Sequence, residues 1–160
     1  MKVIFLDIDG VVNFRYSRSR CQGYTGIDDD KVALLKEIVD ATDANIVLSS
    51  TWRLEYNKAG HHLEKMGDYL KKKLAKQGLS VYDVTPDLGK NGWDRGKEIL
   101  DWLVRHPDVD KYLILDDDEY DFYQIGHEIT DFWIQTEYYS RQGGLQQEHV
   151  DRAIEILNGD

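Results

Sequence analysis

Short apolar segments alternate along the chain with longer segments of helical periodicity. The apolar segments are Lys2–Leu6, Asn45–Leu48, Leu79–Val84, Tyr112–Leu115 and Asp131–Gln135. The helical segments are Asp28–Thr42, Tyr56–Gln77, Asp94–His106 and Gln146–Leu157. A continuous apolar run such as Lys2–Leu6 is typical of a parallel strand that is buried on both faces. The alternation therefore predicts an α/β fold with a five-stranded parallel sheet flanked by helices.

Length and charge limit the organisation of the chain and its partners. The 160 residues suit one domain, 1–160, with a core of useful size. Lys and Arg total 20 and Asp and Glu total 30, which gives a formal charge of −10. An acidic surface repels a phosphate backbone at long range, so a nucleic-acid partner would need a local basic patch.

The cysteine content and the N-terminus bear on the compartment. Cys21 is the single cysteine, so the chain has no internal disulfide, which fits a reducing environment. The start MKVIFLDIDG is too short and too soon acidic for a signal peptide, and no apolar run reaches the length of a membrane span. We therefore expect a cytoplasmic protein with no membrane partner.

Polar clusters follow three of the apolar segments at the point where each ends. Asp7 and Asp9 follow the first, Ser49–Thr51 the second and Asp116–Asp118 the fourth. In open α/β sheets, ligands bind outside the carboxyl ends of the strands. If the first and fourth strands are neighbours, at least three carboxylates converge, and they repel one another unless protons or a cation compensate. Hard oxygen ligands in a partly open site favour Mg²⁺.

Each cluster also has a purely structural explanation when it is taken alone. Two aspartates can cap a helix or close a turn, Asp116–Asp118 can form a solvated turn, and Ser49–Thr51 can be a helix N-cap. All three clusters, however, follow apolar strands in one order within one α/β pattern. This agreement favours a functional site.

The order of the clusters resembles the haloacid dehalogenase (HAD) superfamily of phosphohydrolases over nearly the whole chain. Asp7-Ile8-Asp9-Gly10-Val11 is similar to the first motif, DxDGT/V; Ser49, in IVLSS, matches the second; and Leu115-Asp116-Asp117 matches the acidic fourth motif. The third motif is normally a lysine near a helix start, and here both Arg95 and Lys97 are candidates. More narrowly, SSTWR, TPDLG, RGKEILDWL, YLILDDD and the late GL-x-x-x-HV helix resemble the small HAD domain associated with RNA-repair proteins.

This resemblance implies a Rossmann-like HAD core and Mg²⁺-dependent hydrolysis of a phosphomonoester. Asp7 would be the nucleophile that forms an aspartyl-phosphate, and Asp9 would act first as general acid and then as general base. The metal ligands would be Asp7, the backbone carbonyl of Asp9, and Asp116 or Asp117. The remaining site residues would be Ser49 with Arg95 or Lys97 in catalysis, and Gly10 and Ser50 in substrate binding.

The spacing of the motifs bears on substrate size. HAD proteins often carry a cap domain in one of two gaps, but Val11–Ile27 is too short for one and Trp52–Trp93 is taken up by core elements. The resemblance thus predicts no large cap domain and an open site. Such a site suits a phosphorylated nucleotide or an RNA or DNA end.

The insert NFRYSRSRCQGYTG, within residues 13–27, is predicted to form a flap near the site. Its arginines, Arg15, Arg18 and Arg20, would bind substrate phosphates, and Tyr16 and Tyr24 could stack on bases. The alternative is a solvated loop.

Two other functions compete with a phosphatase for nucleotides or polynucleotide ends. One is a small-metabolite phosphatase, and the other is a catalytically idle HAD-like domain with a binding or regulatory role. The intact set of Asp7, Asp9, Ser49 and Asp116-Asp117 argues against the idle domain.

Overall fold

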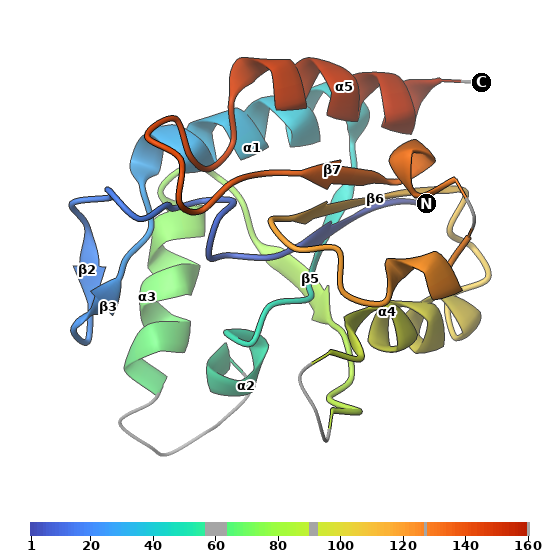
Figure 1. Cartoon of the computed structure of the whole chain (residues 1–160), viewed down its shortest axis with the longest axis horizontal. Coiled ribbons are helices and arrows are strands. Elements are labelled where there is room, and N and C mark those ends of the chain that lie inside the picture. The colour runs from blue at the N-terminus through green and yellow to red at the C-terminus, as the bar shows by residue number, and fades with distance from the viewer. Residues whose placement is uncertain (57–63, 90–92, 127, 160) are drawn as a thin grey trace.

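The computed structural model describes residues 1–56, 64–89, 93–126 and 128–159. Its centre is a five-stranded sheet in the order β5-β4-β1-β6-β7 (Figure 1). The strands are β1 Lys2–Leu6, β4 Asn45–Leu48, β5 Val81–Val84, β6 Lys111–Asp116 and β7 Trp133–Gln135. Every neighbouring pair is parallel, which confirms the predicted fold class.

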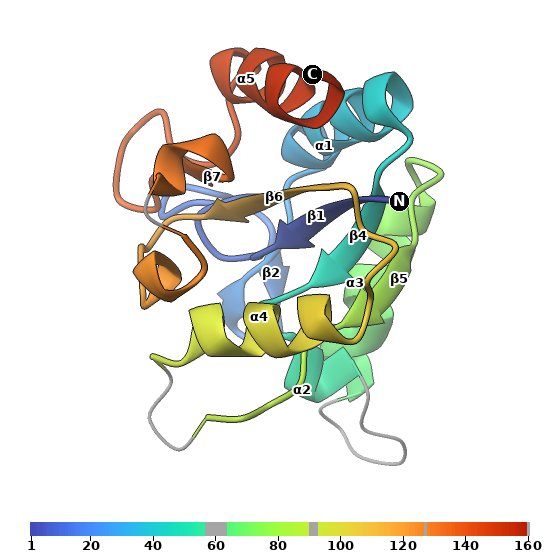
Figure 2. The same ribbon diagram turned by 90° about the vertical axis from the view of Figure 1, so that its right-hand side faces the viewer.

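Helices cover both faces of this sheet, as Figure 2 shows for α1 and α5 on one side and α4 on the other. The helices are α1 Asp29–Thr42, α2 Arg53–Tyr56, α3 Glu64–Ala75, α4 Arg95–Val104 and α5 Gln147–Asn158. Within β1, Ile4 and Leu6 belong to the core cluster on the α1 side, while Val3 and Phe5 belong to the cluster on the α4 side. Burial on both faces explains why β1 is apolar throughout rather than alternating.

The α4 side of the core is built around aromatic rings. Trp102 of α4 is fully buried and meets the Phe5 ring edge-on, with the ring centroids 5.4 Å apart. Phe122 lies in the same cluster, within a 3-10 helix over Phe122–Gln124. Removing a buried aromatic side chain of this size costs about 3–5 kcal/mol of stability. This packing fixes the position of α4 and therefore of the residue at its start.

Several element boundaries differ from the sequence prediction, and three of the differences have a clear structural cause or change an element. The predicted helix Tyr56–Gln77 is represented by α2 and α3, and the part over 57–63 lies outside the described residues. Leu79 does not begin the third strand, because its N–H donates to the Leu74 carbonyl and closes α3 after Gly78, which has φ +73°. The fifth strand begins at Trp133, since Ile129–Asp131 forms a 3-10 turn.

The insert 13–27 contains an antiparallel hairpin that the sequence did not indicate. Its strands, β2 Arg20–Cys21 and β3 Tyr24–Thr25, are joined by Gln22 and Gly23, which have φ values of 52° and 83°. Two positive φ values in a two-residue loop match the twist of a hairpin. At its base, the Ile27 N–H donates to the Tyr69 hydroxyl of α3, 3.0 Å away, and this bond ties the hairpin to the core.

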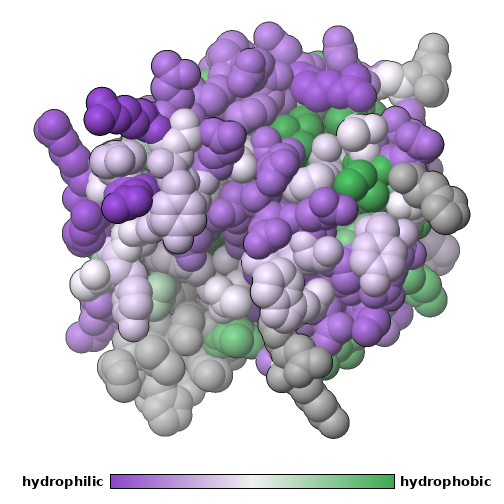
Figure 3. All heavy atoms as spheres, in the orientation of Figure 1, coloured by the Kyte–Doolittle hydropathy of each residue, from purple (hydrophilic) through white to green (hydrophobic). Residues whose placement is uncertain are grey.

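A mainly polar surface is expected from a sequence with 31% charged residues. The face of the molecule in Figure 3 is mainly hydrophilic, with only scattered hydrophobic residues. None of the helices in the described ranges is both long enough and apolar enough to cross a membrane. Between β4 and α4, the described residues 49–56, 64–89 and 93–94 contribute α2, α3 and β5 to the core and form no cap domain.

Candidate active site

The carboxyl ends of β4, β1 and β6 lie side by side and carry the predicted polar residues. Leu6 pairs with both Leu48 and Leu115, so the next residues, Ser49, Asp7 and Asp116, fall in one row. The Asp7 N–H donates to the Leu115 carbonyl at 2.9 Å, which continues the sheet for one more residue. The first and fourth predicted strands correspond to β1 and β6, which pair directly, so the condition for three carboxylates to converge is met.

Three carboxylates converge at this edge. Asp7, Asp116 and Asp117 each offer an oxygen, and these oxygens lie within 4.8 Å of one another. Asp117 approaches closely because residue 10 is glycine. A Cβ on Gly10 would stand 2.6 Å from the Asp117 Cβ, and the φ of +89° at Gly10 disfavours any other residue.

Burial makes this cluster difficult to ionise. It raises the pKa of Asp7, and it raises the pKa of Asp116 further because Asp7 adds its own negative charge. Asp117 has its pKa raised to about 6, first by burial and then by the charge of Asp7. A positive charge nearby stabilises the ionised form of such buried carboxyl groups.

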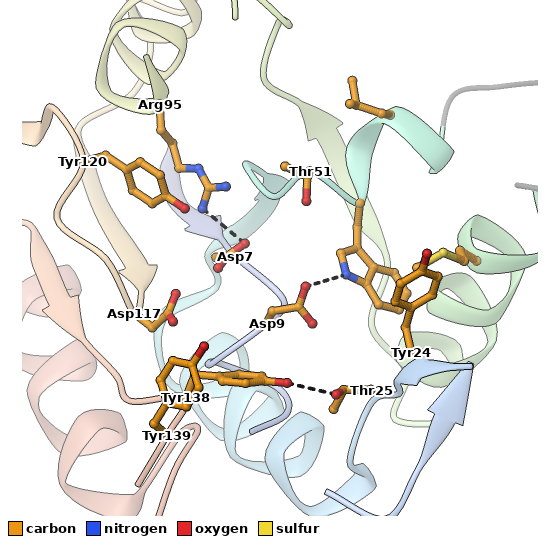
Figure 4. Close-up of a pocket in the computed structure, with 13 residues that line it drawn as sticks. Asp7, Asp9, Tyr24, Thr25, Thr51, Arg95, Asp117, Tyr120, Tyr138 and Tyr139 are labelled. Carbon is orange, nitrogen blue, oxygen red and sulfur yellow. Dashed lines mark hydrogen bonds and ion pairs between the residues drawn. The ribbon is translucent and has the colours of Figure 1, made fainter. Parts of the chain in front are cut away.

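Arg95 supplies positive charge from the first position of α4. Its Nη1 lies 2.5 Å from Asp116 Oδ2 and 3.2 Å from Asp7 Oδ1, and its guanidinium stacks over the Tyr120 ring at 4.3 Å (Figure 4). Burial opposes its charge, but Asp7 and Asp116 outweigh burial and raise the pKa of Arg95 above its ordinary value. Lys97 is exposed and its Nζ pairs with Asp94 at 2.9 Å. The structure thus brings Arg95 into the cluster and leaves Lys97 outside it.

The start of α4 is held by a residue from another segment. Asp121 accepts hydrogen bonds from the N–H groups of Gly96 at 2.5 Å and Lys97 at 3.2 Å. A Cβ on Gly96 would lie 2.6 Å from the Asp121 carbonyl oxygen, so this approach requires glycine. A carboxylate at a helix N-terminus is favourable because the free N–H groups point toward it. Asp121 therefore helps to aim Arg95 at the acidic cluster.

Asp9 is oriented separately from the three carboxylates. Its Oδ2 accepts the indole N–H of Trp52 at 3.0 Å (Figure 4), and its Oδ1 accepts the side-chain amide of Asn13 at 2.9 Å. Asn13 is fully buried and also accepts the Gly10 N–H. Neither Trp52 nor Asn13 is a candidate from the sequence alone. Trp52 is distant in sequence and Asn13 is four residues away, and together they fix the orientation of the Asp9 carboxylate.

The two serines after β4 differ in their surroundings. The Ser50 hydroxyl hydrogen-bonds the Asp7 carboxylate and also accepts the Trp52 N–H at 3.3 Å. Ser49 is fully buried, and its hydroxyl has no partner among the described residues. A buried hydroxyl without a partner is uncommon in proteins. Ser49 thus lies next to Asp7 on the neighbouring strand end, and Ser50 is the serine whose hydroxyl contacts the Asp7 carboxylate.

A buried ion pair connects the serine loop to α4. Arg53 donates to the Ser50 carbonyl at 2.9 Å and to Glu98 Oε2 at 2.7 Å, and both side chains are almost fully buried. Glu98 lies one turn after Arg95 on the same helix. The pair thus couples the two segments that present Ser50 and Arg95 to Asp7.

A pocket of about 650 Å³ opens above these groups. It is lined by Asp7, Asp9, Tyr24, Thr25, Thr51, Trp52, Leu54, Met66, Arg95, Asp117, Tyr120, Tyr138 and Tyr139. None of the insert arginines is among these lining residues. Arg20 donates to the Ser17 and Ser19 carbonyls, Arg18 is exposed, and the Arg15 guanidinium lies 5.8 Å from the ring centre of Tyr139.

A parallel α/β sheet with acids at the ends of two adjacent strands, opposed by a cation from a helix start, defines a HAD-type core. The chain belongs to the family described as the HAD domain in Swiss Army Knife RNA repair proteins, whose model matches residues 3–150. The family expected from the motifs is therefore confirmed. Comparisons with curated proteins and with solved structures found no match. Membership of this family supports phosphatase activity of the HAD type.

Proposed function

We propose that this domain is a Mg²⁺-dependent phosphatase that hydrolyses a phosphomonoester at a nucleotide or polynucleotide end. The observation that carries the proposal is the pairing of two differently held aspartates in one pocket. Asp7 lies in the acidic cluster 3.2 Å from Arg95, and Asp9 is held two residues away by Trp52 and Asn13. In this proposal Asp7 attacks phosphorus and Asp9 transfers a proton.

The acidic cluster fits a hard divalent cation. Three carboxylate oxygens within 4.8 Å of one another are the ligand type that Mg²⁺ prefers. Asp7, Asp116, Asp117 and the backbone carbonyl of Asp9 would hold it. Bound Mg²⁺ would offset the repulsion between the Asp7 carboxylate and a phosphate dianion. The raised pKa values of Asp7, Asp116 and Asp117 are consistent with groups that need such compensation.

The residues of the chain divide the reaction into two displacements. In the first, Asp7 attacks phosphorus, the bond to the leaving oxygen breaks, and protonated Asp9 gives that oxygen its proton. In the second, Asp9 takes a proton from water, and the water oxygen displaces Asp7 from phosphorus and releases inorganic phosphate. Arg95 and Ser50 are placed to bind phosphate oxygens during both steps.

The direct test is hydrolysis of p-nitrophenyl phosphate with and without metal. We expect turnover in Mg²⁺, loss of turnover in EDTA, and recovery when Mg²⁺ is restored in excess. A protein that shows no turnover of any phosphomonoester in saturating Mg²⁺ would instead be the idle binding domain.

Arg95→Ala and Lys97→Ala form a matched pair that distinguishes the two candidates for the third motif. Arg95→Ala should lower kcat/KM by about 10²-fold, because it removes the cation that contacts Asp7 and Asp116. Lys97→Ala should stay within a few-fold of the wild type, because its side chain is exposed and pairs only with Asp94 among the contacts described. Steady-state kinetics decide this, and near-normal rates for both variants would show that the third motif is misplaced.

The preference for a polynucleotide end is tested at Arg15 and Arg18. The double variant Arg15→Ala/Arg18→Ala spares Arg20, whose guanidinium binds two carbonyls of the insert. We expect a higher KM for a phosphorylated oligonucleotide and a flatter salt dependence, by about 0.7 in log–log slope for each lost phosphate contact. Arg152→Ala on α5 is the control for charge, since Arg152 is exposed and pairs with Glu155. An unchanged KM and slope would make the insert a solvated loop.

A further inference from the structure

One wall of the pocket is aromatic. Tyr24, Tyr138 and Tyr139 line it, together with the ring of Trp52. The volume of about 650 Å³ is within the range of pockets for drug-sized ligands. A phosphoryl group at Asp7 would therefore leave most of this space for the rest of the substrate.

Two segments that are distant in sequence build this wall and are joined to each other. Tyr24 and Thr25 come from β3, and Tyr138 and Tyr139 follow β7. The hydroxyls of Thr25 and Tyr138 form a hydrogen bond (Figure 4) with their oxygens 3.0 Å apart, and the Arg15 N–H donates to the Tyr138 carbonyl at 2.9 Å. The wall is thus tied together before any ligand arrives.

Two of these rings are largely free of contacts within the chain. Tyr24 is 67% exposed and Tyr139 is 74% exposed, although both line the pocket. Tyr139 is held edge-on against Tyr138, with ring centroids 5.0 Å apart, and the Arg15 guanidinium stands 5.8 Å from its centre. An exposed aromatic ring offers a surface on which a nucleobase can stack, and a nearby arginine can add a cation–π contribution.

We propose that Tyr24 and Tyr139 form a nucleobase subsite, which binds the base of the nucleotide whose phosphate lies at Asp7. This assignment rests on the proposed phosphatase function and narrows its substrate class. The lining carboxylates are Asp7, Asp9 and Asp117, whereas the wall itself is made of aromatic side chains. A sugar phosphate would leave this wall without a partner, whereas a base would cover it. Stacking is tolerant of base identity, so the subsite selects nucleotides as a class.

The test compares nucleotides with a phosphate that lacks a base. The probes are adenosine 3′-monophosphate, adenosine 5′-monophosphate and ribose 5-phosphate, each with Mg²⁺. The variants are Tyr24→Leu and Tyr139→Leu, with Tyr24→Phe and Tyr139→Phe as matched changes that keep the ring. Tyr82→Leu is the control, since Tyr82 is 55% exposed on β5 and does not line the pocket.

The measured quantity is the ratio of kcat/KM for the better adenosine monophosphate to kcat/KM for ribose 5-phosphate. We expect a wild-type ratio of about 10 to 100, because one base stacked on an aromatic ring is worth about that factor in affinity. Each leucine variant should lower the ratio severalfold or more, and the phenylalanine variants and Tyr82→Leu should keep it.

The outcomes separate the subsite from the phosphatase function. A wild-type ratio near one, or a wild-type ratio that both leucine variants retain, overturns the nucleobase subsite. In that case, hydrolysis of ribose 5-phosphate still supports the phosphatase function. If no probe is hydrolysed, the phosphatase function fails, and titration calorimetry with the same ligands decides the subsite. Adenosine monophosphate binding that Tyr24→Leu and Tyr139→Leu weaken then supports it, and binding no tighter than that of ribose 5-phosphate overturns it.

Discussion

Asp7→Asn is expected to abolish turnover, with a loss of about 10⁴-fold or more in kcat for p-nitrophenyl phosphate. An amide is a far weaker nucleophile toward phosphorus than a carboxylate, so the variant lacks the nucleophile of the first displacement. Asp9 is held in a different orientation by Trp52 and Asn13, where we expect it to transfer protons rather than to attack phosphorus.

The fold should survive this change, and stability provides the control. Burial raises the pKa of Asp7, which means that the folded state disfavours its charge, and a neutral amide removes that penalty. We expect an unchanged or slightly higher Tm for Asp7→Asn without metal, and an unchanged rate for Asp101→Asn, whose side chain is exposed on α4. Beryllofluoride with Mg²⁺ should raise the Tm of the wild type but not of Asp7→Asn. Near-normal turnover by Asp7→Asn would end the covalent mechanism.

The sheet could be predicted from the sequence because strand burial leaves a direct mark on it. Ile4 and Leu6 face one layer of helices and Phe5 faces the other, so no polar residue is tolerated between them. The hairpin β2–β3 leaves no such mark. Its strands have two residues each, and Arg20 and Tyr24 are exposed, so neither the length nor the alternation of a strand can be recognised.

The acidic part of the site could also be predicted, because each acid of the cluster lies at the end of a strand or directly after it. The sequence could not distinguish Arg95 from Lys97 as the cation of the site, since both lie in the first turn of α4. Residues two apart on a helix point about 200° apart, so only the rotation of α4 decides which enters the site. That rotation is fixed by Trp102 in the core and by Asp121 at the helix start. Both contacts are long-range.

The residues that hold Asp9 could not be found from the sequence for a related reason. Trp52 is 4% exposed and has the properties of an ordinary core residue, and only the structure shows where its indole N–H points. Asn13 lies in the insert 13–27, whose arginines are the residue type expected to bind phosphate. A positioning role depends on the direction of one hydrogen bond, and residue type alone does not encode it.

Asp9→Asn is expected to lower kcat/KM on alkyl phosphates by about 10²- to 10⁴-fold, the range for loss of a general acid. An alkoxide is a poor leaving group and needs a proton as its bond to phosphorus breaks. A nitrophenolate needs little protonation, so the loss on p-nitrophenyl phosphate should be at least about tenfold smaller. Initial rates on the two substrates, measured side by side, give this difference directly.

Trp52→Phe tests whether the hydrogen bond to Asp9 matters in the same step. Phenylalanine keeps an aromatic ring in the buried position but removes the indole N–H that donates to Asp9 at 3.0 Å. With Asp9 present but less well oriented, the loss should again be larger on alkyl phosphates, and smaller overall than for Asp9→Asn. A simple packing defect would instead lower the Tm and slow both substrates equally. Equal losses on both substrates in Asp9→Asn itself would remove Asp9 from the general-acid role, and its hydrogen bonds to Trp52 and Asn13 would then serve only to hold the loop after β1.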